Sequence, residues 1–214
     1  MRLKPLLLCA TLAVCAGAQA NTLVSSGFDA GNEGWTAINQ VAVQGWLSTG
    51  GAPGGYFSAR DAGEGMVWLY NAPTAYLGNQ LAALGGTLSF DLKTSTLAAP
   101  MQNWGDVKIA GGGVELVLDA GASPGLEWTS YSAALSPGSW RLGDLNGALA
   151  TAADFQTVLS NVEFLRIRGE FSVALDQGGL DNVVLTSAVP EPASVLMMLA
   201  GLAAVGALAR KRQS

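Results

Sequence analysis

The chain has 214 residues, half of them apolar and 13% charged, with a formal net charge of −5, two cysteines and no histidine. The absence of histidine excludes a Ser-His-Asp triad and removes the commonest general base and metal ligand. The acidic balance argues against nucleic acid as a partner, because phosphates need a basic face.

The first twenty residues are typical of a secretory signal peptide. A basic start is followed by an apolar run from Leu6 to Ala16 and by an Ala-x-Ala site that ends at Ala20. A buried N-terminal helix is the alternative. Cys9 and Cys15 both lie in this segment. We therefore expect a mature protein without disulfides, thiol nucleophile or thiolate metal site.

Residues 21–187 are expected to form one domain. This segment holds fifteen acidic and six basic residues, which gives a net charge of −9. A domain with this charge repels anionic polymers and attracts cations.

The pattern of this segment is mostly that of β-strands. Apolar residues alternate with polar ones in several short runs, and glycine-rich turns such as residues 50–55 and 111–113 separate the runs. The residues predicted to face a core are Met66, Trp68, Tyr70, Leu88, Phe90, Leu92, Val114, Leu116, Leu118, Leu165, Ile167 and Phe171, and Leu180 to Leu185 forms a closing strand. Acids in or beside these runs are expected to be solvated: Asp91, Asp106, Glu115, Asp119, Glu163 and Glu170.

One helix interrupts the strands. Thr151 and Asp154 form a capping box, and Phe155, Val158, Leu159 and Val162 follow at helical spacing. We expect this helix to cover one end of the sandwich. The predicted fold class is all-β, an antiparallel β-sandwich of jelly-roll, galactose-binding-like type with one short helix.

Residues 188–214 combine three features in a fixed order. Pro190, Glu191 and Pro192 come first, residues 193–209 form an uncharged segment long enough for a minimal membrane span, and Arg210, Lys211 and Arg212 follow. The positive-inside rule keeps the basic cluster cytoplasmic. This order resembles the PEP-CTERM sorting signal of Gram-negative bacteria.

The resemblance implies that these six residues are a sorting and processing signal, not an active site. Such a tail is recognised and removed by a membrane enzyme, an exosortase. The implied route is export through the Sec pathway, an inner-membrane intermediate held transiently by segment 193–209, and then the cell surface or extracellular matrix. A permanent one-helix anchor is the alternative.

The body resembles the laminin IV type A domain, also called the laminin B domain. Among the stretches that carry it are Gly85–Leu92, Ala152–Asn161, Leu165–Phe171 and Leu180–Val183, of which Gly85–Asp91 and Leu165–Glu170 are distinctive. The resemblance runs from about Phe28 to Leu185 in consistent order. It implies a β-sandwich of an extracellular, non-catalytic module, without the disulfide-rich neighbours found in laminins.

Calcium is the candidate cofactor, because only oxygen ligands remain in a chain without histidine or mature cysteine. First and last strands of a jelly roll are often neighbours, which would bring Asp29, Asn32 and Glu33 near Asp181. The alternative is that these residues serve turns and strand ends.

Tryptophan suggests carbohydrate binding, since aromatic faces stack on pyranose rings. Trp104 lies in a polar loop and is the best candidate for an exposed, sugar-stacking ring, followed by Trp46 and Trp140. For each of the three, packing in the core is the competing role.

The sequence thus predicts a non-enzymatic surface protein with a structural or adhesive role in the polysaccharide or biofilm matrix. A calcium-stabilised carbohydrate-binding module is the second hypothesis, and a polysaccharide hydrolase, which would need two suitably spaced carboxylates, is the third.

Overall fold

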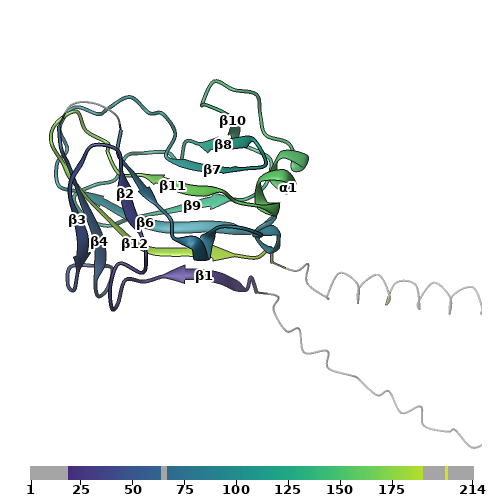
Figure 1. The fold of residues 1–214 in the computed structure, drawn as a ribbon, viewed down its shortest axis with the longest axis horizontal. Helices are drawn as coiled ribbons and strands as arrows, with labels where there is room; N and C mark the ends of the chain where they lie inside the picture. Colours follow the sequence, from purple (N-terminus) through teal and green to yellow (C-terminus); the bar gives the residue numbers. More distant parts are fainter. Residues whose placement is uncertain (1–18, 64–66, 190–200, 202–214) are drawn as a thin grey trace, which may run out of the picture. The chain divides into compact units, whose positions relative to one another are not determined.

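Two antiparallel β-sheets packed face to face form the described part of the chain (Figure 1). The computed structural model describes residues 19–63, 67–189 and 201, and Ala20–Ala188 form one compact unit. Sheet A has the order β3-β4-β12-β6-β9, with β1 also paired to β12, and sheet B has the order β10-β8-β7-β11-β5-β2. The strands are β1 (Thr22–Ser26), β2 (Thr36–Ile38), β3 (Val41–Leu47), β4 (Tyr56–Asp61), β5 (Leu69–Asn71), β6 (Thr87–Thr94), β7 (Val107–Gly111), β8 (Val114–Leu118), β9 (Thr129–Ala134), β10 (Arg141–Leu142), β11 (Phe164–Arg168) and β12 (Gln177–Thr186).

The predicted fold class is confirmed, and β6 shows why the pattern was informative. Leu88, Phe90 and Leu92 are at most 2% exposed, whereas the residues between them are half-buried on the outer face. Side chains alternate between the two faces of a strand, so a period of two creates one core face. Trp68 and Tyr70 are fully buried, as predicted; Met66 lies outside the described residues.

β12 is the organising strand of sheet A. Its first half, Gln177–Leu180, pairs with β4, its second half from Val183 pairs with β1, and β6 runs along its other side. Strands from the beginning, middle and end of the chain therefore meet in one sheet.

The predicted helix is α1 (Ala152–Ser160), and its capping box is present. Thr151 Oγ1 accepts the Asp154 amide, and the Asp154 carboxylate accepts the Thr151 amide. The apolar side of α1 packs at the end of the sandwich where β1 begins and β12 ends (Figure 1). Two 3₁₀ turns, η1 (Thr74–Tyr76) and η2 (Leu81–Ala83), complete this region.

A side chain closes the gap between the edges of the two sheets. Gln44 of edge strand β3 accepts a hydrogen bond from the Ala37 amide and donates one to the Ala37 carbonyl oxygen, at 2.5 and 3.0 Å. Because Ala37 lies on edge strand β2, the Gln44 amide satisfies backbone groups that an edge would leave unpaired.

The prediction that Asp106 and Glu170 are solvated is wrong. Both are 4% exposed, because segments 97–106 and 170–176 pair with each other and fold against the end of sheet B. The Met101 amide donates to the Phe171 carbonyl, and the Val173 amide donates to the Ala99 carbonyl. Strand alternation alone carries no information about such a covering loop.

Candidate functional site

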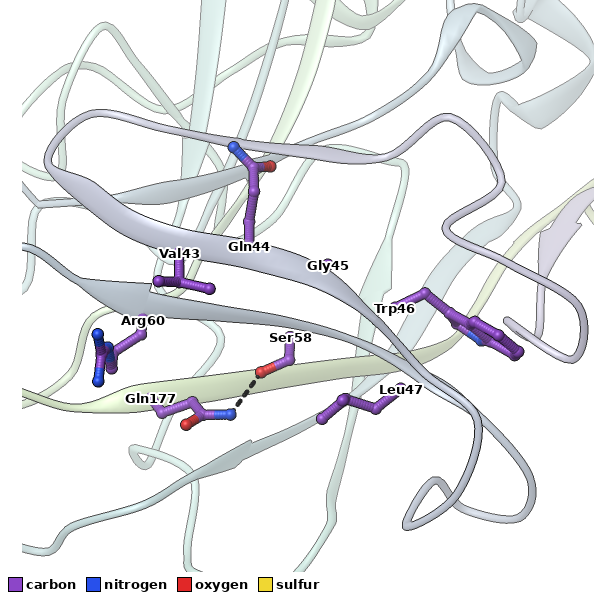
Figure 2. A pocket seen from close by; sticks show the side chains of 8 residues that line it. All are labelled: Val43, Gln44, Gly45, Trp46, Leu47, Ser58, Arg60 and Gln177. Atoms are coloured by element: carbon purple, nitrogen blue, oxygen red, sulfur yellow. Dashed lines mark hydrogen bonds between the residues drawn. The ribbon is translucent and has the colours of Figure 1, made fainter.

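The outer face of sheet A carries a groove that crosses its first three strands (Figure 2). Phe57 and Ala59 of β4 point into the core, so Ser58 and Arg60 between them point outward. The groove has a volume of about 300 Å³. Its lining residues come from β3, β4 and β12: Val43, Gln44, Gly45, Trp46, Leu47, Ser58, Arg60 and Gln177.

Small residues make the hollow. Gly45 and Ser58 are register partners on β3 and β4, and Gly179 of β12 is the partner of Ser58 on the other side. A Cβ on Gly45 would meet no atom within 4 Å, so the space above this position is open. Gly45 and Ser58 therefore lower the floor below the flanking residues, whereas the space above Gly179 is occupied by Lys93 and Trp128.

Polar groups on the floor are held in place by hydrogen bonds. Gln177 Nε2 donates to Ser58 Oγ at 2.8 Å, and Ser58 Oγ donates to the Gly178 carbonyl oxygen at 3.2 Å (Figure 2 shows the first bond). The amide and hydroxyl are thus fixed before any ligand arrives, which lowers the entropy lost on binding.

A second hollow, of about 290 Å³, adjoins the first, because Gln177 borders both. It lies over β12 and β6, and its other lining residues are Tyr56, Lys93, Thr94, Ser95, Leu126 and Gly178. We call the two hollows together the sheet A groove.

A cation between two aromatic rings forms one wall of the sheet A groove. Lys93 Nζ lies 4.0 Å from the ring centroid of Tyr56 and 4.3 Å from that of Trp128. Lys93 Nζ and Trp128 Nε1 both donate to the Gly50 carbonyl oxygen, at 2.7 and 3.0 Å. Burial lowers the pKa of Lys93, against the opposing effect of the Glu127 and Asp181 charges. The cluster fastens the turn of residues 50–55 to the sheet.

The lining of the sheet A groove combines amide, hydroxyl, cationic and aromatic groups. No lining residue of the sheet A groove is Asp or Glu, and its two charged residues are Arg60 and Lys93. A glycosidase needs a pair of carboxylates across the scissile bond. Amide, hydroxyl, guanidinium and aromatic groups instead match the hydroxyls and apolar faces of a sugar.

The three predicted tryptophans lie in three different places. Trp46 is 36% exposed and lies at one end of the groove in Figure 2, with its Nε1 donating to the Phe28 carbonyl oxygen at 2.6 Å. Trp104 is 56% exposed and lies over sheet B. Trp140 is 1% exposed and packs edge-to-face on Phe155, so it belongs to the core and presents no face to a ligand.

Of the predicted calcium ligands, Asp29 and Asp181 face the same turn. The Asp181 carboxylate is fully buried and accepts the amides of Ala52 and Asn182 at 2.6 and 2.7 Å. A Cβ on Gly54 would lie 3.0 Å from Asp29 Oδ1. Burial raises the pKa of Asp181, and the charges of Asp91 and Asp29 raise it further.

The other two predicted ligands have different surroundings. Asn32 donates to the Trp35 carbonyl oxygen, and Glu33 has a φ of 49° in an adjoining turn. Within residues 19–63, 67–189 and 201, no group of three or more Asp, Glu, Cys or His lies close enough to hold a metal ion. Calcium binding stays a prediction.

The predicted signal peptide lies almost wholly outside the described residues. The sorting-signal residues Pro190, Glu191, Pro192, Arg210, Lys211 and Arg212 lie outside them too, as does segment 193–209 except Gly201. In the part of the chain that is described, no helix is long and apolar enough to cross a membrane.

Comparison with known families supports both resemblances. The profile of the laminin B (domain IV) family matches residues 69–199, which is more than half of the chain. The chain belongs to the laminin B (domain IV) family. The PEP-CTERM protein-sorting motif matches residues 188–213, directly after the laminin B domain's last strand.

Individual relatives agree with this assignment. The chain is 32% identical over 134 residues to mouse (Mus musculus) laminin subunit alpha-1. The match covers 58% of this chain and 4% of that protein. Among solved structures it is similar to the L4b domain of human laminin alpha-2, with 19% identity and a TM-score of 0.51 over 57% of this chain and 71% of that one.

A second structural likeness is to a family 30 carbohydrate-binding module of a cellulosomal cellulase from Clostridium thermocellum. It has 12% identity and a TM-score of 0.50, covering 77% of this chain and 98% of that one. At this identity the likeness shows the fold of the laminin B domain and nothing more.

Proposed function

We propose that the protein is a non-catalytic surface protein that binds extracellular polysaccharide through the sheet A groove. The observation that carries this proposal is the lining of the groove. It offers a fixed amide and hydroxyl, a guanidinium and aromatic rings, and its lining contains no carboxylate. These groups suit the binding of sugars and give no acid–base pair for hydrolysis.

The sorting motif at residues 188–213 supports the cellular setting of the proposal. We infer that residues 1–20 direct export through the Sec pathway and that residues 21–187 form the domain that reaches the surface. Residues 188–214 would hold an inner-membrane intermediate through segment 193–209 until an exosortase removes the tail. In this setting the domain has a structural or adhesive role in a polysaccharide matrix.

The fold is also compatible with this role. The C. thermocellum module with a similar fold is described as carbohydrate-binding, and we take from it only that such a sandwich can present a sugar site. Mouse laminin subunit alpha-1 is far longer than this chain, so its assembly and partners are not carried over.

Filling the groove tests the proposal directly. Gly45→Val would place a branched side chain on the groove floor, where a Cβ meets no atom within 4 Å and where β-branched residues suit a strand. The matched control is Ala42→Val, which also introduces a valine at an exposed position of the same strand but outside the groove lining.

The assay is native affinity electrophoresis of the form that accumulates in cells expressing the full chain. The gels contain polysaccharide from the producing bacterium, xylan or mixed-linkage β-glucan. We expect at least one polymer to retard the wild type and the Ala42→Val variant equally, and to retard Gly45→Val less, with an unchanged melting temperature. Retardation of Gly45→Val equal to that of the wild type would place binding elsewhere.

The same mixtures distinguish the two other candidate functions. If no polymer retards the wild type, the domain has a structural role without polysaccharide binding. A steady rise in reducing ends would identify a hydrolase. We expect no rise.

A further inference from the structure

A second pocket lies on the opposite side of the sandwich, under Trp104. Its volume is about 430 Å³, and it is lined by Leu69, Met101, Trp104, Lys108 and Asn39 among others. Tyr70 and Ile109 are core residues, so their strand neighbours Leu69 and Lys108 point away from the core. The pocket therefore opens on the outer face of sheet B, whereas the groove opens on the outer face of sheet A.

The loop that presents Trp104 is held rigidly. Arg168, which is 2% exposed, donates to the carbonyl oxygens of Met101 and Gln102 at 3.3 and 3.1 Å. Asn103 Oδ1 accepts the Gly105 amide at 2.8 Å. A Cβ on Gly105 would lie 2.2 Å from Val117, so the backbone lies directly on sheet B. A fixed loop presents the indole without an ordering cost on binding.

The pocket has the chemistry of a sugar subsite. More than half of the surface of Trp104 is exposed, beside the thioether of Met101 and the branched side chain of Leu69. An amide from Asn39 and the ammonium of Lys108 border this apolar surface. An apolar platform with a few polar groups at its rim suits a pyranose ring, whose face is apolar and whose edge carries hydroxyls.

The lining of the pocket resembles that of the sheet A groove in its residue types, although Lys108 Nζ is paired with Glu115 Oε1 at 3.3 Å. Neither lining contains Asp or Glu, and each contains a cationic residue, although residues 21–187 carry a net charge of −9. The linings on the two opposite faces thus both lack acidic residues, although the domain as a whole is acidic.

We propose that the Trp104 pocket binds the same class of polysaccharide as the sheet A groove, so that one domain bridges two polysaccharide chains. This inference rests on the proposed function of the groove. Two sites on opposite faces cannot both lie against one straight stretch of polymer, so the second site links a second chain. Bridging would make the protein a cross-linker of its matrix.

The test measures bridging and binding separately. The probe is the polymer that retards the wild type in the gel assay, used once immobilised on beads and once in solution with a fluorescent label. The protein is the form that accumulates in cells expressing the full chain. We expect the wild type to capture labelled polymer on the beads, and capture to fall again at high protein concentration, when every site on each chain is saturated.

Single variants decide between one site and two. We expect Trp104→Ala and Gly45→Val each to abolish capture of labelled polymer while the remaining site keeps the protein on the beads. Trp104→Phe keeps an aromatic ring and is expected to restore capture. Leu149→Ala, which removes an apolar side chain of similar exposure (55%) outside both sites, is expected to bridge like the wild type.

Two outcomes would overturn the inference and leave the proposed function intact. If Trp104→Ala still bridges, the pocket is not a second site, and a dimer with one groove per copy explains the bridging. If the wild type binds and never bridges, the domain has one site. Failure of every polymer to bind the wild type would refute both proposals.

Discussion

The Nη1 atom of Arg168 lies 3.4 Å from Oδ1 of Asp106, and the side chains of both residues are almost fully buried. The pair joins the end of β11 to the residue that precedes β7. Burial raises the pKa of Asp106 and lowers that of Arg168, so desolvation outweighs the mutual attraction for both partners. The pair therefore fixes the position of the Trp104 loop at an energetic cost.

Breaking this pair on one side is expected to be strongly destabilising. Arg168→Met would leave Asp106 buried without its cation and two loop carbonyls without their donor. We expect the free energy of unfolding, measured by urea titration, to fall by about 3–5 kcal/mol. Lys108→Met is the control, since it breaks the more exposed Lys108–Glu115 pair and should cost less than about 1 kcal/mol. A loss below that value for Arg168→Met would show that the pair is dispensable.

The sequence was sufficient to predict elements whose pattern is local. The alternation in β6 and the capping box of α1 both follow from neighbouring residues, and both are confirmed. The burial of Arg168 depends on a loop whose path no residue near Arg168 encodes. For the same reason, strand alternation alone predicted solvated side chains for Asp106 and Glu170, which are buried.

The sheet A groove was missed for a related reason. Its floor joins Gly45, Ser58 and Gln177, which are far apart in sequence and meet only through the register of β3, β4 and β12. Aromatic residue types in the sequence indicate Trp46, whereas a hollow made by small residues leaves no such local pattern. Knowing the pairing of β12 in advance would have revealed it.

Gly169 is expected to tolerate no side chain. A Cβ at this position would lie 1.9 Å from the ring of Trp68, which is fully buried and cannot move aside without disturbing the core. We expect Gly169→Ala to lower the free energy of unfolding by about 1–3 kcal/mol or more. Gly45→Ala is the matched control, because its Cβ meets nothing within 4 Å. Equal denaturation midpoints for the two variants would contradict the packing described around Trp68.

Calcium is predicted to stabilise the turn that Asp29 and Asp181 share. A bound cation would offset the repulsion by which Asp29 and Asp91 raise the pKa of Asp181. We expect the melting temperature to be higher with calcium than with a chelator, because a ligand of the folded state stabilises it. Asp29→Asn should abolish the difference. An identical melting temperature in the two buffers would remove the calcium hypothesis.

The carboxyl group of Asp176 is buried in the interior of the domain, near other acidic residues and aromatic rings. It is 2% exposed and accepts a hydrogen bond from Thr94 at 3.3 Å. Burial raises its pKa, and the charge of Asp61 raises it further, while the hydrogen bond from Thr94 opposes the shift. Glu170 nearby also has a raised pKa, for which burial is again the main cause.

A raised pKa in the folded state means that folding favours the protonated carboxyl. The stability that Asp176 contributes is therefore fully present below the ordinary carboxyl pKa and is lost as the pH rises through the raised value. Asp176→Asn keeps the shape and cannot ionise, so we expect its melting temperature to exceed that of the wild type at alkaline pH. The difference should shrink as the pH is lowered, while the exposed Asp144→Asn control follows the wild type throughout. A difference that is constant across the pH series would show that Asp176 does not titrate on unfolding.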